Sequence, residues 1–297
     1  MLVTLYPGAN RADVVATLRQ LAADAQNASN THGQAHDRLT AYLEWATNSV
    51  RMLEHRVGAA DIDRLVLTRG YERLLSVAGI GSPRVLNGLL NLEIHQRVNA
   101  IEQAARELDA QIARWSGELA FVVPDTSVYL EHDDKLEVLD FTSLLGVRPD
   151  KTVRVIVPVI ILDELDGQKN RGEPLKRWRP AYTLGVMDRV LADGSGTGVL
   201  HPQSADRSLG GVVLDVLFDP PGHVRLAISD DEIVDRALAA QALAGIPVTL
   251  VTFDTGQSTR ARHAGLRVIK LSKPLGEEPQ NTKNPKAKRA LAANRQQ

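Results

Sequence analysis

The chain has 297 residues and no cysteine, which excludes disulfides, thiolate zinc sites, iron–sulfur clusters and cysteine nucleophiles. Hydrophobic residues make up 43% and charged residues 24%, as in ordinary soluble proteins, and the length accommodates two domains. No run approaches ~18 apolar residues, and the first residues lack the order of a signal peptide. We therefore expect a soluble cytoplasmic protein without a membrane partner.

The net charge of −1 hides an uneven distribution along the chain. Residues 1–117 carry twelve arginines against twelve acidic residues, residues 118–272 carry a net charge of −5, and the remainder carries +4. An acidic middle region is unusual for a protein that binds nucleic acid, unless bound cations neutralise part of the charge.

Residues 1–117 predict a helical bundle. Apolar residues recur at steps of three and four within 39–53, as on one face of a helix. Pro83 suits a first helical turn, and after it a heptad seam follows, formed by Ile94, Val98, Ile101, Ala105, Leu108 and Ile112. We expect three to five helices. No residue in this region has catalytic spacing, and its role stays open; it is a candidate surface for a homo-oligomer or a protein partner.

Residues 118–272 alternate apolar runs with helical patterns. Buried strands are predicted at 119–123, 153–157, 212–218, 247–252 and 266–271, and helices near 135–145, 159–169, 174–193, 231–244 and 256–264. Strands separated by helices of this length predict an α/β domain with a parallel sheet that is covered on both faces.

Three other features predict no chemistry. Residues 273–297 are rich in polar residues and predict a disordered basic tail. The glycine-rich stretch Gly194–Gly198 lacks the Lys-Ser/Thr of a phosphate loop and is interpreted as a flexible link. The histidines at 132, 201, 223 and 263 show no paired ligand spacing, so a zinc site is not expected.

Acidic residues follow the predicted strands. Asp125 and Asp254 come directly after two of them, Glu164 lies about a turn into the helix after another, and Asp230 with Asp231 begins a helix. Because the carboxyl ends of parallel strands meet at one crevice, we expect these side chains to lie together. Clustered carboxylates raise one another's pKa unless a cation neutralises them, and Mg²⁺ or Mn²⁺ prefers such oxygen ligands.

Each acid taken alone has a simpler interpretation. Asp125, Asp230 and Asp254 could each be only the N-cap of a helix. Asp163, Asp166, Asp231 and Glu232 are of a type that is more often solvated on a helix surface. The ordered set is harder to attribute to chance: Asp-Thr-Ser, then Pro-x-x-x-Leu-x-Glu-Leu, then Asp-x-x-Ile-x-x-x-Ala-Leu, then Thr-x-Asp.

This ordered set resembles that of PIN-domain nucleases, from about Glu118 to Leu271. The resemblance implies an α/β/α fold with a central parallel sheet, and cleavage of single-stranded RNA with Mg²⁺ or Mn²⁺. It also implies hydrolysis by metal-activated water that leaves a 5′-phosphate. By the same resemblance the metal-binding and catalytic acids are Asp125, Glu164, Asp230 and Asp254, with Asp231 as the alternative for the third and with Ser127 and Thr252 as supporting hydroxyls.

Basic residues around one tryptophan follow the helix of Glu164. These residues, which are candidates for RNA binding, are Lys169, Arg171, Lys176, Arg177, Trp178 and Arg179. Lysine and arginine would contact phosphates, and the indole would stack on a base. The alternative is a solvated loop and helix start with Trp178 packed inward.

Three functional interpretations compete. The leading one is a metal-dependent ribonuclease. The second is a catalytically silent PIN-fold protein that binds RNA or acts as a scaffold, with the helical region recruiting partners. The third, a small-molecule or nucleotide-binding α/β domain, is disfavoured because no glycine fingerprint is present. The extra helical region argues mildly against a simple toxin.

Overall fold

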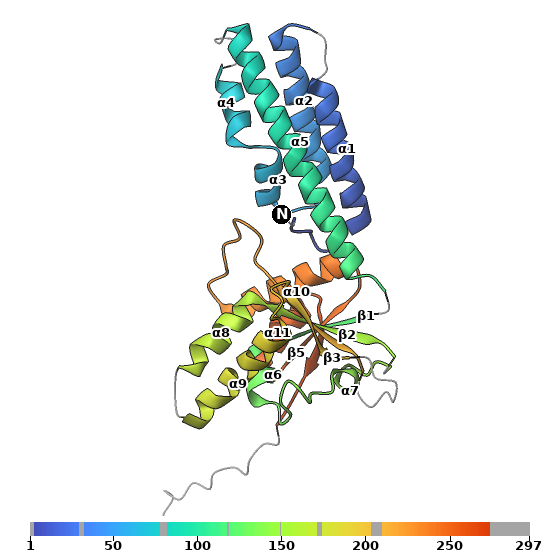
Figure 1. The fold of residues 1–297 in the computed structure, drawn as a ribbon, viewed down its shortest axis with the longest axis vertical. Coiled ribbons are helices and arrows are strands. Elements are labelled where there is room, and N and C mark those ends of the chain that lie inside the picture. The colour runs from blue at the N-terminus through green and yellow to red at the C-terminus, as the bar shows by residue number, and fades with distance from the viewer. Residues whose placement is uncertain are drawn as a thin grey trace, which may run out of the picture.

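A computed structural model describes residues 3–29, 33–77, 82–117, 119–148, 150–170, 174–202 and 210–273. An elongated bundle of helices stands above an α/β part, and the chain passes from the first to the second once (Figure 1). No helix within these ranges is long and apolar enough to cross a lipid bilayer.

The bundle contains five helices within the described residues. They are α1 (Arg11–Ser29), α2 (Ala35–Leu53), α3 (Ala59–Leu65), α4 (Arg69–Val77) and α5 (Pro83–Arg114). The predicted first turn of α5 is confirmed, since Pro83 follows the cap Ser82, whose Oγ accepts a hydrogen bond from Val85 N at 3.4 Å. The seam residues Ile94, Ile101 and Leu108 are buried as α5 packs against α1 and α2.

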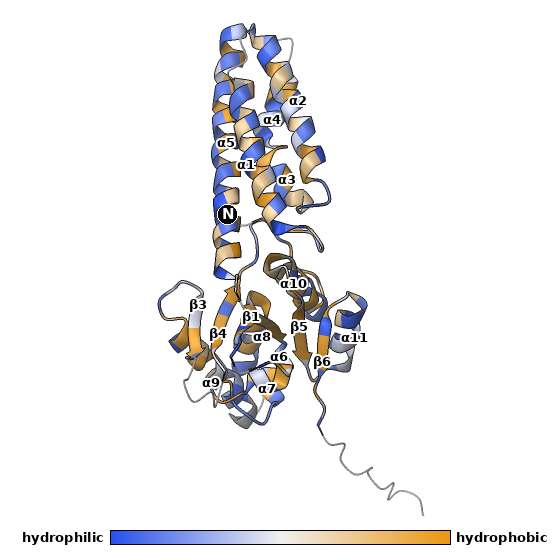
Figure 2. Ribbon diagram, turned by 90° about the vertical axis from the view of Figure 1, so that its right-hand side faces the viewer, coloured by the Kyte–Doolittle hydropathy of each residue, from blue (hydrophilic) through white to orange (hydrophobic). Residues whose placement is uncertain are grey.

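The second part is built on a six-stranded sheet with the order β3-β4-β2-β1-β5-β6. The strands are β1 (Leu119–Pro124), β2 (Thr152–Pro158), β3 (Thr197–His201), β4 (Val212–Leu217), β5 (Val248–Thr252) and β6 (Arg267–Lys270). The five predicted strands are present and parallel, and β3 adds an antiparallel edge strand. Hydrophobic residues dominate the central strands in Figure 2, as expected for a sheet covered on both faces.

The strand β3 corrects the interpretation of Gly194–Gly198 as a flexible link. Gly194 and Gly196, both with φ of +73°, form a turn, but Thr197 and Gly198 already pair with β4. A Cβ at Gly198 would lie 1.9 Å from the carbonyl oxygen of Val190, so only glycine lets the strand pass this close to the preceding helix.

Helices cover the sheet. They are α6 (Thr126–Glu131), α7 (Phe141–Leu145), α8 (Val159–Lys169), α9 (Pro174–Val190), α10 (Ser229–Ala244) and α11 (Thr255–His263). Helices α6, α8 and α9 contact one another, and α10 contacts α11 and also α8. The short α6 was not predicted, and the helix expected near 135–145 is restricted to α7.

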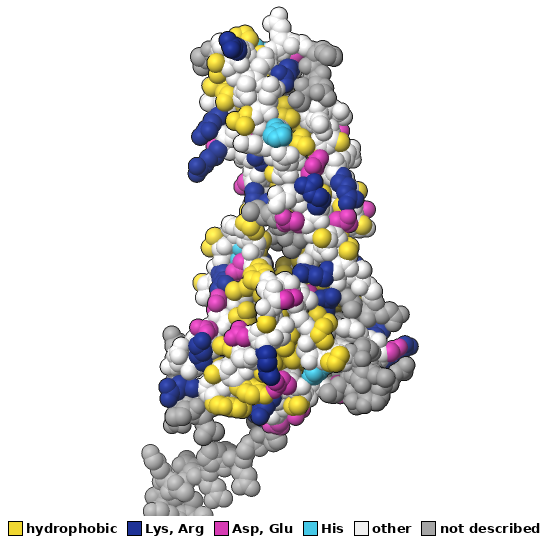
Figure 3. Space-filling model, viewed as in Figure 1, with side chains coloured by type: hydrophobic (Ala, Val, Ile, Leu, Met, Phe, Trp, Pro, Cys, Tyr) yellow, Lys and Arg dark blue, Asp and Glu magenta, His cyan; other side chains and the backbone are white. Residues whose placement is uncertain are grey.

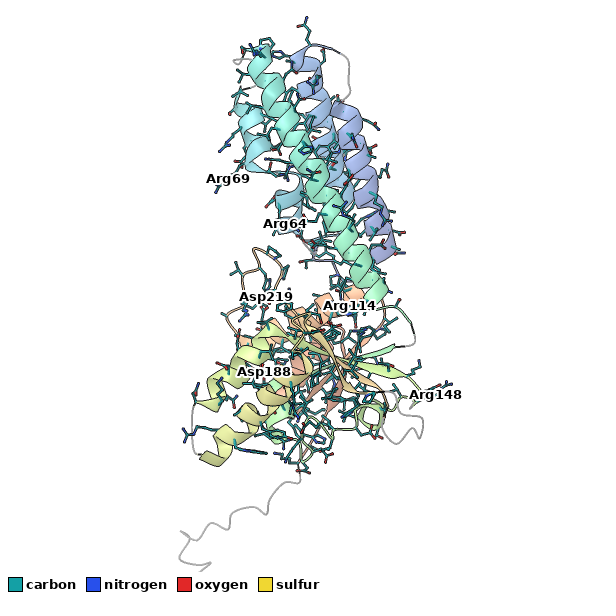
Figure 4. All side chains as sticks on the ribbon, in the orientation of Figure 1. Arg64, Arg69, Arg114, Arg148, Asp188 and Asp219 are labelled. Atoms are coloured by element: carbon teal, nitrogen blue, oxygen red, sulfur yellow. The ribbon has the colours of Figure 1, made fainter. Side chains whose placement is uncertain are left out.

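Buried polar contacts join the two parts. Asp215 of β4 is 1% exposed and accepts hydrogen bonds from Trp115 Nε1 at 2.6 Å and from Arg154 Nη1 at 2.7 Å. Arg114, which lies at the lower end of α5 (Figure 4), forms an ion pair with the same carboxylate at 3.5 Å. At the other side of the junction, Arg11 Nη1 donates to the carbonyl oxygen of Leu243 at 2.6 Å.

On this basis we propose domains at 1–117 and 118–272, since α5 ends at Arg114 and β1 begins at Leu119. The predicted basic tail lies outside the described residues beyond Lys273.

Candidate metal centre

The fold brings the predicted acids to one edge of the sheet. Strands β1 and β5 are parallel neighbours, with Pro124 opposite Val251, so the residues that follow them meet at the carboxyl edge. Asp125 caps α6 there, and Asp254 caps α11. Glu164 reaches the same edge from α8, and Asp230 and Asp231 lie in the first turn of α10.

Asp125 is held rigidly by hydroxyl groups. Its side chain is 5% exposed, and its two carboxylate oxygens accept hydrogen bonds from Ser127 Oγ and Thr252 Oγ1, both at 2.5 Å. Ser127 Oγ also accepts from Phe253 N at 2.9 Å, and Thr252 Oγ1 accepts from Asp254 N at 2.8 Å. The predicted hydroxyls therefore tie Asp125 to the backbone that carries Asp254.

Burial dominates the electrostatics of Asp125. Desolvation raises its pKa above the ordinary value of 3.8, although hydrogen bonds from Ser127, Thr252 and Val128 oppose the shift. A carboxylate that is both desolvated and fixed in place has a strong requirement for a neighbouring positive charge.

Glu164 is positioned by a residue that the sequence did not single out. Thr126, which is 7% exposed, donates a short hydrogen bond from Oγ1 to Glu164 Oε2. The signal was present in the Asp-Thr-Ser triplet, but only the fold shows that its middle hydroxyl faces α8.

Asp230 interacts with the charges of the other acids. Its pKa is raised first by burial and then by Asp254, with smaller contributions from Glu164 and Asp231, while Arg260 opposes the shift. Asp230 is therefore within electrostatic range of Asp254, Glu164 and Asp231. Asp125 is linked to this group through the hydrogen bond of Thr252, whose Oγ1 also accepts from Asp254 N.

Arg260 of α11 was also missed by the sequence analysis. Its guanidinium group pairs with Asp230 Oδ2 at 3.1 Å and with Asp231 Oδ1 at 2.9 Å. All three side chains are about 40% exposed, and ion pairs in contact with water contribute little to stability. Arg260 neutralises part of the acidic cluster without closing it to solvent.

The donor set fits a hard divalent cation. Carboxylates from four segments lie at the same edge of the sheet, and the pKa of Asp230 is raised by burial and then by the charge of Asp254. Mg²⁺ and Mn²⁺ favour such oxygen ligands, and a bound cation would relieve the mutual repulsion of the carboxylates.

Comparison with known families agrees with this geometry. The profile of the PIN domain family matches residues 122–272, about half of the chain. The chain belongs to the PIN-domain family. PIN domains are generally metal-dependent nucleases that act on nucleic acids. No curated protein matches this chain.

The candidate RNA-binding residues of the PIN domain differ in their surroundings. Trp178 is 50% exposed and does not pack inward; it stacks on Tyr182 with ring centroids 4.9 Å apart. Lys135 Nζ lies 5.1 Å from the Trp178 ring centroid. Lys169 pairs with Asp166 at 2.5 Å, and Arg177 is exposed. Arg171 and the side chain of Lys176 lie outside the described residues.

Arg179 has a structural role in the PIN domain. Its guanidinium group donates to the carbonyl oxygens of Tyr129 at 3.0 Å and His132 at 2.7 Å, and also to that of Asp134. These bonds hold the turn after α6 and leave the group poorly placed for phosphate contacts.

One histidine of the PIN domain joins an unexpected polar cluster. Single ligand atoms of Asp219, His223 and Glu232 all lie within 4.8 Å of one another. Glu232 is fully buried and contacts His223 Nε2 at 2.7 Å, while Arg225 pairs with Asp219 at 2.7 Å. The contacts of His223 with Glu232 and of Arg225 with Asp219 form a network that fixes the loop between β4 and α10.

Proposed function

We propose that this protein is a metal-dependent ribonuclease that hydrolyses phosphodiester bonds of single-stranded RNA. The observation that supports it is the position of Asp125, Glu164, Asp230 and Asp254 at one edge of the sheet, where Thr126 contacts Glu164 and Thr252 joins Asp125 to the backbone of Asp254. These four acidic residues would hold Mg²⁺ or Mn²⁺, with Asp231 as the alternative to Asp230, since Arg260 pairs with both.

When bound, the cation supplies a water of lowered pKa and charge for the phosphate to bind. The chain supplies the positioning. Ser127 and Thr252 fix both oxygens of Asp125, and Thr126 fixes one oxygen of Glu164. Asp230, with its raised pKa, is suited to orient the attacking water through a carboxylate oxygen.

The RNA would be held mainly by stacking and by scattered cations. Figure 3 shows lysine and arginine side chains interspersed with acidic ones on the face that it displays, without a continuous basic band. The exposed ring of Trp178, with Lys135 beside it, offers a surface for a base. Lys169 and Arg177 are the described cations that we propose for phosphate contacts.

Cleavage of an unstructured, end-labelled RNA tests this proposal. We expect cleavage with Mn²⁺ or Mg²⁺ and none with a chelator. Asp125→Asn should reduce the rate by about 100-fold or more, because it removes a ligand from the centre. The matched control is Asp188→Asn, an exposed residue of α9 (Figure 4).

Two further readouts separate the alternatives. A Mn²⁺-induced rise in melting temperature that disappears in Asp254→Ala supports metal binding at the acids. Wild-type protein that binds RNA without cutting it would favour the silent RNA-binding or scaffolding alternative. Full activity in a folded Asp125→Asn variant would refute the assignment of the centre.

A further inference from the structure

A hollow lies beside the segment that carries Asp254. It has a volume of about 510 Å³, and its walls are formed by Glu131, His132, Asp133, Phe253, Leu271, Ser272 and Lys273. Phe253 immediately precedes Asp254, and its amide is bonded to Ser127 Oγ. The opposite wall contains Glu131, the last residue of α6. Asp125 caps the start of this six-residue helix, which is roughly 9 Å long. The hollow therefore lies beside the acids at the same edge of the sheet.

One wall of the hollow is aromatic. The rings of His132 and Phe253 meet edge to face, with centroids 6.3 Å apart and planes at 66°. Phe253 is partly exposed, so this geometry leaves ring surface directed into the hollow. A partly exposed ring beside the proposed metal centre is suited to stack on a nucleobase.

The rim of the hollow carries charges of both signs. Lys273 Nζ lies 5.5 Å from the Phe253 ring centroid and pairs with Glu131 at 3.3 Å. Both side chains of that pair are about half exposed, so the pair is weak and can exchange for a ligand. The ammonium group can contact a phosphate, while the carboxylates of Glu131 and Asp133 can accept hydrogen bonds from amino groups of a base.

Hydrogen bonds within the chain fix the walls of the hollow. Arg179 fixes the carbonyl of His132, and Asp134 N donates to His132 Nδ1 at 3.0 Å, which sets the imidazole. On the other side, Lys270 Nζ donates to the carbonyl oxygens of Phe253 and Leu271. A hollow with fixed walls loses little entropy on binding.

We propose that this hollow is a subsite for one base of the single-stranded RNA next to the cleaved phosphate, with stacking on Phe253 and a preference for amino-bearing bases over uracil. Guanine, adenine and cytosine present amino groups to Glu131 and Asp133, and uracil presents none. The inference rests on the proposed ribonuclease function and adds a substrate preference to it.

Oligouridine substrates with a single guanine, adenine or cytosine at each position in turn test this subsite. We expect the wild-type protein to cut at a fixed offset from the inserted base. Phe253→Ala should lower kcat/KM on these substrates about tenfold, and Phe253→Trp should restore it. The matched control is Phe218→Ala, whose ring is 64% exposed at the end of β4 and does not line the hollow.

A separate pair of substitutions tests the carboxylates of Glu131 and Asp133. The double variant Glu131→Ala, Asp133→Ala should lose the preference for the inserted base, because alanine offers no acceptor for an amino group. Equal cleavage of all substrates by the wild-type protein, or a Phe253→Ala variant that behaves like Phe218→Ala, would overturn the subsite.

Failure of the proposed function remains distinguishable from failure of the subsite. The Asp125→Asn variant is expected not to cut RNA, so its affinity for the same oligonucleotides is measured by fluorescence anisotropy. A base preference that Phe253→Ala removes supports the subsite even if no cleavage is found. No preference in that measurement contradicts the subsite even if the wild-type protein is an active nuclease.

Discussion

The carboxyl group of Asp230 experiences two opposite influences. Burial and the charges of Asp254 and Glu164 raise its pKa, while Arg260 lowers it, and the net shift is upward. Asp125 is shifted in the same direction by burial. For both residues, the ionised carboxylate is less stable in the folded protein than in the unfolded chain. Such raised pKa values are typical of functional sites.

These raised pKa values predict that a lower pH stabilises the metal-free protein and weakens metal binding. A carboxyl group whose folded pKa is raised takes up its proton in the folded state first, so metal-free protein gains stability from this group as pH falls through the raised pKa towards 3.8. The metal competes with that proton, so the affinity for Mn²⁺ should fall over the same pH range. Calorimetric titration with Mn²⁺ across this range checks the prediction.

Groups with lowered pKa values, such as Asp140, act in the opposite sense. They lose stabilisation as pH falls below their ordinary value, so the stability curve must be compared with that of Asp230→Asn. The difference between the two curves isolates Asp230. A difference that does not change with pH would contradict the prediction.

Arg260 should act as an internal competitor of the metal. Replacing it in Arg260→Ala removes a positive charge 2.9 Å from Asp231 and 3.1 Å from Asp230. Without metal, we expect the free energy of unfolding to fall by less than about 1 kcal/mol. With metal, we expect Mn²⁺ to bind a few-fold more tightly. Arg262→Ala, an exposed arginine of the same helix, is the control. Unchanged Mn²⁺ affinity in Arg260→Ala would show that the guanidinium group does not compete.

At the scale of elements, the acids have a second task as helix caps. Asp254 Oδ1 accepts a hydrogen bond from Gln257 N at 2.8 Å, and Asp125 Oδ1 accepts one from Val128 N at 3.2 Å. The sequence leaves both a helix cap and a metal ligand open for Asp125 and Asp254. The cap is present, and a carboxylate has enough lone pairs to accept a hydrogen bond and also bind a cation.

Two substitutions at Asp254 separate these tasks. Asp254→Asn keeps an oxygen that can cap α11, whereas Asp254→Ala removes it, at a cost of about 1 kcal/mol. We expect both variants to lose metal-dependent cleavage and only the alanine variant to lose stability in chemical denaturation. Retained cleavage in the asparagine variant would show that Asp254 acts only as a cap.

The sequence predicted the elements with strong patterns and missed those with weak ones. The apolar runs of β1, β2, β4 and β5 are buried on both faces, so composition alone located them. The edge strand β3 follows a glycine-rich turn and is partly exposed, and α6 has only six residues, so neither has a periodic signal.

The same reasoning applies to the centre. The order of the acids along the chain predicted which residues would meet, because parallel strands end at one edge. Thr126 and Arg260 could not be predicted, since a hydroxyl facing α8 and an arginine facing α10 depend on how helices pack, which no local pattern encodes.

At the scale of the whole molecule, Asp215 joins the helical region to the sheet. Asp215→Ala would remove the acceptor shared by Arg154 Nη1 and Trp115 Nε1, whose residues are 12% and 2% exposed. Removing one partner of a buried ion pair costs about 3–5 kcal/mol. We expect a loss of this size in urea unfolding, with Asp188→Ala as the exposed control. A loss below 1 kcal/mol would show that the junction does not depend on this carboxylate.

The hydrogen bond between Thr252 and Asp125 spans 127 positions of the chain. During synthesis the Asp125 segment leaves the ribosome long before the strand that must lie beside it. A growing polypeptide therefore lacks the complete set of acids until its penultimate strand has been made and inserted. Under the proposed function, the centre would be inert during translation, and the messenger would not be exposed to a complete set of acids on an unfinished chain.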